Sequence, residues 1–168
     1  RHEGNSRVAL AFLDEINNAH YTFYKPAVEE SMRFSNPGQD DIVLFGSSFA
    51  AKAEGREDLM RFIERAGHNG SVILYDPNFR KQHLHDLPHL KLMIQENISL
   101  ATIVRGSHED FSFIYGARDV EETYKYFGDK PPCLLYTFST KGVFLKTPSL
   151  TEKFSVKRIA TKSTIGAG

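Results

Sequence analysis

The sequence predicts an open α/β fold, in which a mostly parallel sheet carries helices on both faces. From residue 41 onward, short apolar runs alternate with amphipathic stretches, which is typical of a parallel sheet with crossover helices. These runs are apolar at nearly every position rather than at every second one, as in strands that are covered on both sides. The segment before them has a hairpin pattern, so a small β-sheet subdomain is also expected.

The composition is that of one globular domain that does not bind polyanions. The chain has 168 residues, of which 40% are hydrophobic and 25% charged, and 21 basic residues balance 21 acidic ones. A net charge of zero offers no general attraction to nucleic acid or to an anionic membrane. A single cysteine, and the lack of any apolar run near the ~20 residues of a membrane span, indicate a soluble, cytoplasmic protein.

Residues 1–36 are expected to form the small β subdomain. Apolar and aromatic runs at 8–13 and 21–24 are separated by turn-forming Asn and Asp residues, which predicts a β-hairpin. A Ser-Asn-Pro-Gly sequence at 35–38 then interrupts the chain. Residues 37–168 are expected to form part of an α/β core.

The core is expected to alternate strands with helices. Strands are predicted at 42–45, 71–75, 100–104, 133–137 and 143–145. Helices are predicted at 56–66, 87–97, 107–115 and 120–127. The first helix has the clearest pattern, because Leu59, Phe62, Ile63 and Ala66 follow the spacing of one helical face. Ligands of such sheets bind outside the carboxyl ends of the strands, so residues that follow strands are the first candidates for a site.

Three polar side chains follow the predicted strand 71–75. Asp76, Asn78 and Arg80 place a carboxylate, an amide and a guanidinium within one turn at the expected crevice. Arginine can bind phosphate or carboxylate with two hydrogen bonds, and aspartate can orient either neighbour. The alternative is an Asp-Pro turn with a solvated arginine, and the spacing alone leaves both interpretations open.

A second cluster follows the predicted strand 100–104. Ser107 is a good helix N-cap, and Glu109 and Asp110 are acidic residues in the first helical turn, where the helix dipole favours them. The same carboxylates could hold Mg²⁺ through its water ligands. The local pattern favours the cap over the metal site.

The chain ends on a glycine pair that could bind an anion. Gly166, Ala167 and Gly168 allow several backbone N–H groups to point together, and a helix beginning there would add its positive end. A plain loop is the alternative. The chain starts without methionine and ends on this loop signal, which predicts a fragment of a longer protein.

Two further groups have weaker patterns. His83, His85 and His89 are close in sequence, but nothing indicates the additional ligands that a metal site needs. Several aromatic residues could line a small-molecule pocket, although such residues belong more often to a core. These residues are Tyr21, Phe23, Tyr24, Phe45 and Phe49.

Taken together, these motifs resemble the ribokinase (PfkB) family of sugar kinases, and most of all its fructokinase-like branch. The resemblance rests on Asp-x-Asn-x-Arg after one strand, Ser-x-x-acid after the next, a Thr-Phe-Ser-Thr-Lys-Gly turn at 137–142, and the terminal Thr-Ile-Gly-Ala-Gly. Their order and approximate spacing agree from about Val8 to Gly168. The resemblance implies ATP-dependent phosphoryl transfer to a sugar hydroxyl, on an α/β core with a small β-sheet lid over the sugar.

The resemblance also implies roles for individual residues. Gly166, Ala167 and Gly168 would form the anion hole for the transferring phosphoryl group, and the base that deprotonates the sugar would be an aspartate just after the chain end. Arg80 and Asn78 would face the phosphates or the sugar, and Asp76 would hold them. The nucleotide would be bound by Asn78, Ser107, Thr137, Ser139 and Gly142.

The remaining implied roles concern the metal, the sugar and the partners. Asp110 matches the acid of the family's metal motif, and with Glu109 it would hold Mg²⁺ through water. Tyr21 and Phe23, in lid strands, would close over the sugar and exclude water. The resemblance implies ATP and Mg²⁺ as cofactors and a small-molecule sugar as substrate, without nucleic acid or membrane partners. Some family members are activated by K⁺ near the terminal loop, and members often pair as homodimers through their lids.

Several positions depart from the family pattern. Ser107 stands where asparagine is usual, Asp110 where glutamate is usual, Ser139 where glycine is common, and Ser163 where an aspartate usually opens the final motif. The shorter reach of Asp110 would rearrange the metal shell. These substitutions keep open a non-catalytic sugar- or nucleotide-binding relative, and Asp76 with the histidines keeps open a different, metal-dependent α/β enzyme.

Overall fold

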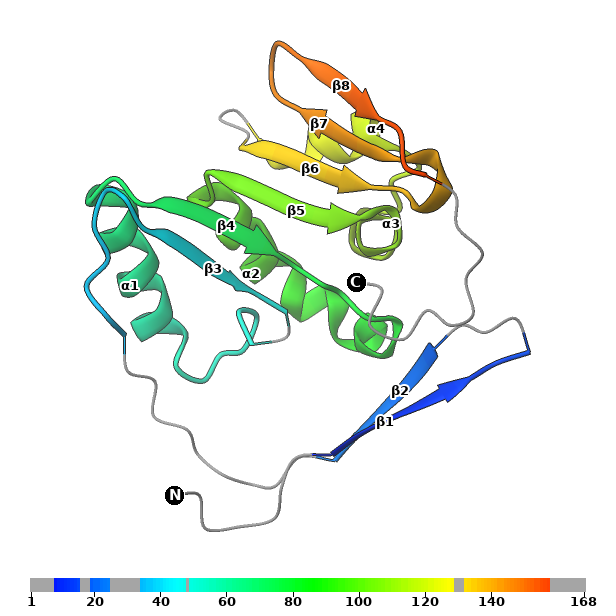
Figure 1. Ribbon diagram of the computed structural model, residues 1–168. Coiled ribbons are helices and arrows are strands. Elements are labelled where there is room, and N and C mark those ends of the chain that lie inside the picture. The colour runs from blue at the N-terminus through cyan, green and yellow to red at the C-terminus, as the bar shows by residue number, and fades with distance from the viewer. Residues whose placement is uncertain (1–7, 16–18, 25–33, 48, 129–131, 158–168) are drawn as a thin grey trace. The chain divides into compact units, whose positions relative to one another are not determined.

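The computed structural model describes residues 8–15, 19–24, 34–47, 49–128 and 132–157. The chain divides into two compact units, one of Arg1–Met32 with Lys157–Gly168 and one of Arg33–Val156, and each is described by itself (Figure 1). None of the described helices is long and apolar enough to cross a membrane.

The first unit contains a β-hairpin. Strands β1 (Val8–Leu13) and β2 (Ala19–Tyr24) pair antiparallel, which confirms the predicted hairpin. The second strand begins at Ala19 rather than at the expected residue 21, because its pairing with β1 extends to Ala19 opposite Leu13. Val8, Leu10 and Phe12 alternate along β1 and are exposed, so β1 presents a row of apolar side chains.

The second unit is built on a six-stranded sheet in the order β3-β4-β5-β6-β7-β8. The strands are β3 (Ile42–Gly46), β4 (Val72–Asp76), β5 (Ile103–Ser107), β6 (Cys133–Thr137), β7 (Val143–Lys146) and β8 (Thr151–Phe154). Strands β3 to β6 pair parallel, whereas β7 is antiparallel to both of its neighbours. The predicted open, mostly parallel α/β sheet is thereby confirmed. The sequence does not predict β8, because all four of its residues are exposed and no apolar pattern marks them.

The helices lie between the strands, as the sequence predicts. They are α1 (Arg56–His68), α2 (Leu87–Leu100), α3 (His108–Tyr115) and α4 (Val120–Tyr124). Short 3-10 helices are η1 (Lys81–Asp86), η2 (Lys125–Phe127) and η3 (Ser139–Lys141). The predicted strand start at residue 100 is wrong, because α2 continues to Leu100 and β5 begins only at Ile103. Apolar residues suit a helix end and a strand equally well, so the run 100–104 does not mark the boundary.

Side chains at every second strand position form the core. Val104 lies opposite Leu134 in the β5–β6 pairing, and both are fully buried. Apolar residues of α1 to α4 belong to the same buried cluster, and α2 and α4 pass behind the strands in Figure 1. At Gly106 a Cβ atom would lie 2.6 Å from the Phe111 ring, so a glycine allows α3 to pack closely on β5.

The other face of the sheet carries no helix among the described residues. Ile42 and Leu44 are 71% and 68% exposed, whereas Val43 and Phe45 between them are buried. The described helices cover one face of the sheet, and the helices expected over the other face stay a prediction. The strands are apolar at both sets of positions, which indicates burial on two sides, but only one set meets helices within the described part of the chain.

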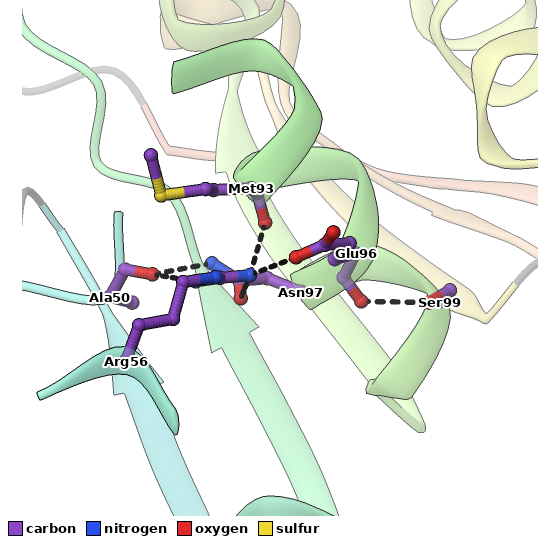
Figure 2. A network of polar contacts seen from close by, with 6 residues as sticks. All are labelled: Ala50, Arg56, Met93, Glu96, Asn97 and Ser99. Atoms are coloured by element: carbon purple, nitrogen blue, oxygen red, sulfur yellow. Dashed lines mark hydrogen bonds and ion pairs between the residues drawn. The ribbon is translucent and has the colours of Figure 1, made fainter. Parts of the chain in front are cut away.

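The loop between β3 and α1 is held in place by Arg56 and Asn97 (Figure 2). The Ala50 carbonyl accepts hydrogen bonds from Arg56 Nη1 at 2.8 Å and from Asn97 Nδ2 at 3.0 Å. Arg56 Nη2 also donates to Glu96 Oε2 at 2.6 Å and to the Met93 carbonyl at 3.3 Å. These contacts tie the loop that follows β3 to α2, and Asn97 is fully buried among them.

Candidate active site

The carboxyl ends of the parallel strands gather polar residues that the sequence singles out. Asp76 ends β4, Ser107 ends β5 and Thr137 ends β6. Ser107 lies opposite Thr137, and Asp76 lies opposite Gly46, the last residue of β3. Three motifs that are distant in sequence therefore meet where the parallel strands end. This side of the sheet, formed by the carboxyl ends of the strands, is the polar edge.

The backbone turns sharply at the same edge. Ser47, Asn78 and Ser139 are the non-glycine residues with positive φ in the described ranges, at 59°, 39° and 41°. Each follows the end of a parallel strand by one or two residues. Such conformations cost about 1–3 kcal/mol each and cluster at functional sites, which makes this edge the first candidate for ligand binding.

An ion pair links β4 to β5. Arg105 Nη1 donates to Asp76 Oδ2 at 2.9 Å, and the Asn78 N–H donates to Asp76 Oδ1 at 3.0 Å. The Arg105 and Asp76 side chains are 33% and 23% exposed. Arg80, the arginine expected beside Asp76, lies exposed at the start of η1. Asp76 is therefore paired with Arg105 and not with Arg80.

Sequence reasoning missed Arg105, because the expected strand 100–104 stops one residue before it. In the structure β5 continues to Ser107. Tyr75 lies opposite Val104, so Asp76 and Arg105, the next residue on each strand, stand side by side on the same face. An arginine directly after an apolar run, level with an aspartate that ends the neighbouring strand, is the signal that could have found this pair.

A close approach of β3 to β4 fixes the backbone of Asp76. The Ser47 N–H donates to the Asp76 carbonyl oxygen at 2.9 Å. A Cβ atom on Gly46 would overlap the same carbonyl group. A glycine is therefore required at the end of β3 for the two strand ends to meet.

Ser107 and Asp110 form a capping box at the start of α3. Asp110 Oδ2 accepts from the Ser107 N–H at 2.7 Å and from Ser107 Oγ at 2.6 Å, while the Asp110 N–H donates to Ser107 Oγ at 3.1 Å. Burial raises the pKa of Asp110, and the hydrogen bonds from Ser107 oppose that rise. The cap is confirmed, and the part of Asp110 and Glu109 in binding Mg²⁺ stays a prediction.

The turn after β6 is closed by its own backbone. The Phe138 N–H donates to the Gly142 carbonyl at 2.9 Å, and the Lys141 N–H donates to the Phe138 carbonyl at 2.8 Å. Gly142 has φ 105°, and a Cβ atom there would overlap the Phe154 carbonyl at the end of β8. The segment 137–142, which the family resemblance assigns to the nucleotide, is therefore a defined turn at the same edge.

A cavity of about 840 Å³ lies along β3, within the range of small-molecule pockets. Phe45 and Phe49, two of the aromatic residues expected to line a pocket, contribute to its wall. Asp76 and Asn78 also line it, so the cavity is continuous with the polar strand ends.

Other predicted site residues are not placed by the structure. Gly166, Ala167 and Gly168 lie outside the described residues. Tyr21 and Phe23 belong to β2, but their side chains are not among those described. Their roles stay predictions.

The histidine cluster does not form a metal site in the described part of the chain. No group of three or more His, Cys, Asp or Glu side chains there could hold a metal ion. His85 instead lies beside Asp86, with 3.0 Å between Nε2 and Oδ2. Cys133 is half-buried, and burial raises the pKa of its thiol, which disfavours the reactive thiolate.

Comparison with known proteins identifies relatives among sugar kinases. Residues 1–168 match the family described as pfkB family carbohydrate kinase. A fructokinase from Vibrio alginolyticus is 24% identical over 171 residues, covering 99% of this chain and 56% of that protein. A fructokinase from Salmonella thompson is 28% identical over 170 residues, covering 93% of this chain and 73% of that protein.

Solved structures share the fold. The fructokinase from Vibrio cholerae O395, in its fructose, ADP and calcium ion bound form, has a TM-score of 0.79 at 23% identity and covers 100% of this chain and 56% of its own. Aminoimidazole riboside kinase from Salmonella enterica, complexed with aminoimidazole riboside and an ATP analog, has a TM-score of 0.71 at 21% identity, covering 80% and 46%.

The matches cover nearly all of this chain but only part of its relatives. The chain spans 56% of the length of the Vibrio alginolyticus fructokinase. The family match, however, extends over every residue from 1 to 168, and the fold agrees with that of two sugar or riboside kinases. This chain therefore belongs to the pfkB family of carbohydrate kinases.

Proposed function

We propose that this protein is an ATP-dependent sugar kinase of the fructokinase type, which transfers the γ-phosphoryl group of ATP to a sugar hydroxyl. Family membership supports phosphoryl transfer to a carbohydrate, and the curated fructokinases support a fructose-like acceptor. The observation that carries the proposal is the polar edge of the sheet. There the Asp76–Arg105 pair, the Ser107 cap and the turn 137–142 lie at adjacent strand ends, where ligands of open α/β sheets bind.

In phosphoryl transfer the protein contributes positioning and charge neutralisation rather than covalent chemistry. The reaction needs an in-line arrangement, neutralisation of phosphate charge and a base for the attacking hydroxyl. Asp76 holds the Arg105 guanidinium at the edge, and its remaining N–H groups can donate to phosphate or sugar oxygens. Asn78 and Arg80 are proposed to face the same ligands.

Gly166, Ala167 and Gly168 are proposed as the anion hole, with the base supplied by an aspartate after them. The sheet topology supports this role, because β8 is parallel to β6 and its carboxyl end lies at the polar edge. Gly166 follows Phe154, the end of β8, by 12 residues, a segment that can span up to about 40 Å. The terminal loop can therefore reach the strand ends.

Mg²⁺ is proposed to bind with the nucleotide and to neutralise charge on its phosphates. The acids of α3 fit a water-mediated site, which needs only one or two carboxylates. Glu109 is exposed, and Asp110 lies buried beside it, held by Ser107. Thr137, Ser139 and Gly142 are proposed to contact the nucleotide, and K⁺ is proposed to bind backbone near the terminal loop.

The hairpin is proposed to act as a lid over the sugar. In this proposal residues 1–36 form the lid and 37–168 the nucleotide- and substrate-binding core. Tyr21 and Phe23 of β2 would close over the substrate and exclude water. The exposed apolar side chains along β1 suit contact with the lid of a second subunit in a homodimer.

A coupled ADP-release assay on the full-length protein tests the proposal. With Mg-ATP and a panel of sugars, fructose first, we expect sugar-dependent ADP release that stops when Mg²⁺ is chelated. Absence of turnover with every sugar would refute the kinase. Nucleotide binding without turnover would support a non-catalytic relative instead.

A further inference from the structure

A stack of side chains joins the start of α3 to the turn after β6. The His108 ring, at the first position of α3, lies parallel to the Phe138 ring, with 3.8 Å between centroids and 13° between planes. His108 Nδ1 is also 2.7 Å from the buried hydroxyl of Tyr136 in β6. Lys141 Nζ lies 4.0 Å from the centroid of the Phe138 ring.

These distances place Phe138 between two partners. An ammonium group and a parallel imidazole cannot both stand about 4 Å from one ring centroid on the same face, since they would overlap. Lys141 and His108 therefore cover opposite faces of Phe138. The imidazole is in turn held in its plane by Tyr136.

The stack acts on a turn whose conformation is unfavourable by itself. Ser139 has φ 41°, a conformation that side-chain-bearing residues adopt at a cost. Phe138 and Lys141 belong to the turn, whereas His108 belongs to the neighbouring strand–helix junction. His108 is thus the member that anchors the turn to a separate element.

We propose that His108 is a positioning residue for the nucleotide, which acts through Phe138 to hold residues 139–142 in the shape that receives the phosphates. The inference rests on the proposed function for the identity of the ligand. His108 itself needs no contact with ATP. The flat ring of His108 makes the stacking contact with Phe138. Another aromatic side chain at this position should therefore keep that contact, and an aliphatic side chain should lose it.

Variants of the full-length protein test this role. His108→Ala should raise the KM for ATP about tenfold, the equivalent of one aromatic contact, while the KM for the sugar stays unchanged. His108→Phe keeps the stacked ring but not the hydrogen bond with Tyr136, so it should restore the KM for ATP in part, to a value between those of His108→Ala and the wild type. His68→Ala, which changes an exposed histidine at the end of α1, is the control and should leave both constants unchanged. Equal changes in both KM values, or failure of His108→Phe to rescue, would overturn the proposal.

A second measurement does not depend on turnover. Calorimetric titration with ADP should show weaker binding to His108→Ala than to His108→Phe. In His108→Ala, hydrogen exchange should also be faster than in the wild type at the hydrogen-bonded amides of the turn, which are those of Phe138, Lys141 and Gly142. If ADP binds His108→Ala as tightly as the wild type, His108 has no positioning role. If His108→Ala binds ADP more weakly than the wild type but the wild type phosphorylates no sugar, the positioning role of His108 stands and the proposed kinase activity is refuted.

Discussion

Asp76 and Arg105 form one unit although 28 residues separate them in the sequence. The Asp76 carboxylate accepts one hydrogen bond from Arg105 and another from the Asn78 N–H. Because the pair is mostly buried, removal of the guanidinium leaves a carboxylate that has lost its charged donor and part of its contact with water. The same pair presents a cation at the proposed phosphate site.

Arg105→Met should therefore lower the free energy of unfolding by about 1–2 kcal/mol, the range for a partly exposed hydrogen bond between charged groups. Arg80→Met is the matched control, because Arg80 is exposed, and should change stability by less than about 0.5 kcal/mol. Urea denaturation of both variants measures the difference. Equal losses would contradict the pairing of Asp76 with Arg105.

At the scale of elements, one carboxylate attaches α4 to the β7–β8 hairpin. Thr151 Oγ1 donates to Glu121 Oε1 at 2.8 Å, and Lys146 Nζ lies 3.1 Å from Glu121 Oε2. Lys146 also donates to Thr151 Oγ1 at 2.8 Å. The hydrogen bond from Thr151, followed by Lys146, lowers the pKa of Glu121. The edge hairpin is thereby connected to a helix on the covered face.

This attachment should depend on pH. Because the folded-state pKa of Glu121 is below its unfolded value, its stabilisation is complete above the unfolded pKa and is lost as the pH falls through the folded one. Glu121→Gln should therefore destabilise the protein near neutral pH, by at most about 0.5 kcal/mol because the Glu121 side chain is 55% exposed, and should have little effect in acid. Thermal unfolding of both proteins across this range is the measurement. Glu152→Gln, on the exposed strand β8, is the control, and a Glu121→Gln effect that persists in acid would exclude the ionic contact.

At the scale of the whole sheet, its two outer strands, β3 and β8, differ in chemistry. The β8 edge has the sequence Thr-Glu-Lys-Phe, and the β3 edge has the sequence Ile-Val-Leu-Phe-Gly. Charged side chains on an edge strand discourage pairing with a further strand, whereas an apolar edge favours it. Ile42 and Leu44 on β3 are also more than two-thirds exposed. Strand β3 is therefore a second surface, besides the β1 side chains proposed for the lid contact, on which the 168-residue chain should associate.

Leu44→Lys should reduce this association. A lysine on β3 places charge on this apolar strand, and the average mass of the 168-residue chain in light scattering should fall below that of the wild type. Leu92→Lys is the control, because Leu92 is 69% exposed on α2, away from the sheet edge. An average mass that stays unchanged in Leu44→Lys, or that falls equally in both variants, would exclude β3 as the contact.

Local patterns were enough to predict most elements and part of the site. The apolar spacing of α1 and the capping signal at Ser107 depend on residues within one or two helical turns, so both can be recognised in the sequence. The rule for strand ends also placed Asp76 and Ser107 at the carboxyl ends of successive strands, because parallel strands share a direction, whereas Thr137 was indicated only by the family resemblance. These features required no knowledge of which strands are neighbours.

Contacts between distant segments were decided by the packed chain alone. Arg105 meets Asp76, and His108 meets Phe138, only because β5 lies between β4 and β6 in a particular register. The same is true of the sheet face that bears Ile42 and Leu44, since the apolar pattern indicates burial but not which surface covers it. Backbone conformation follows from near neighbours in the chain, whereas pairing and burial follow from register and packing between elements, which no local pattern contains.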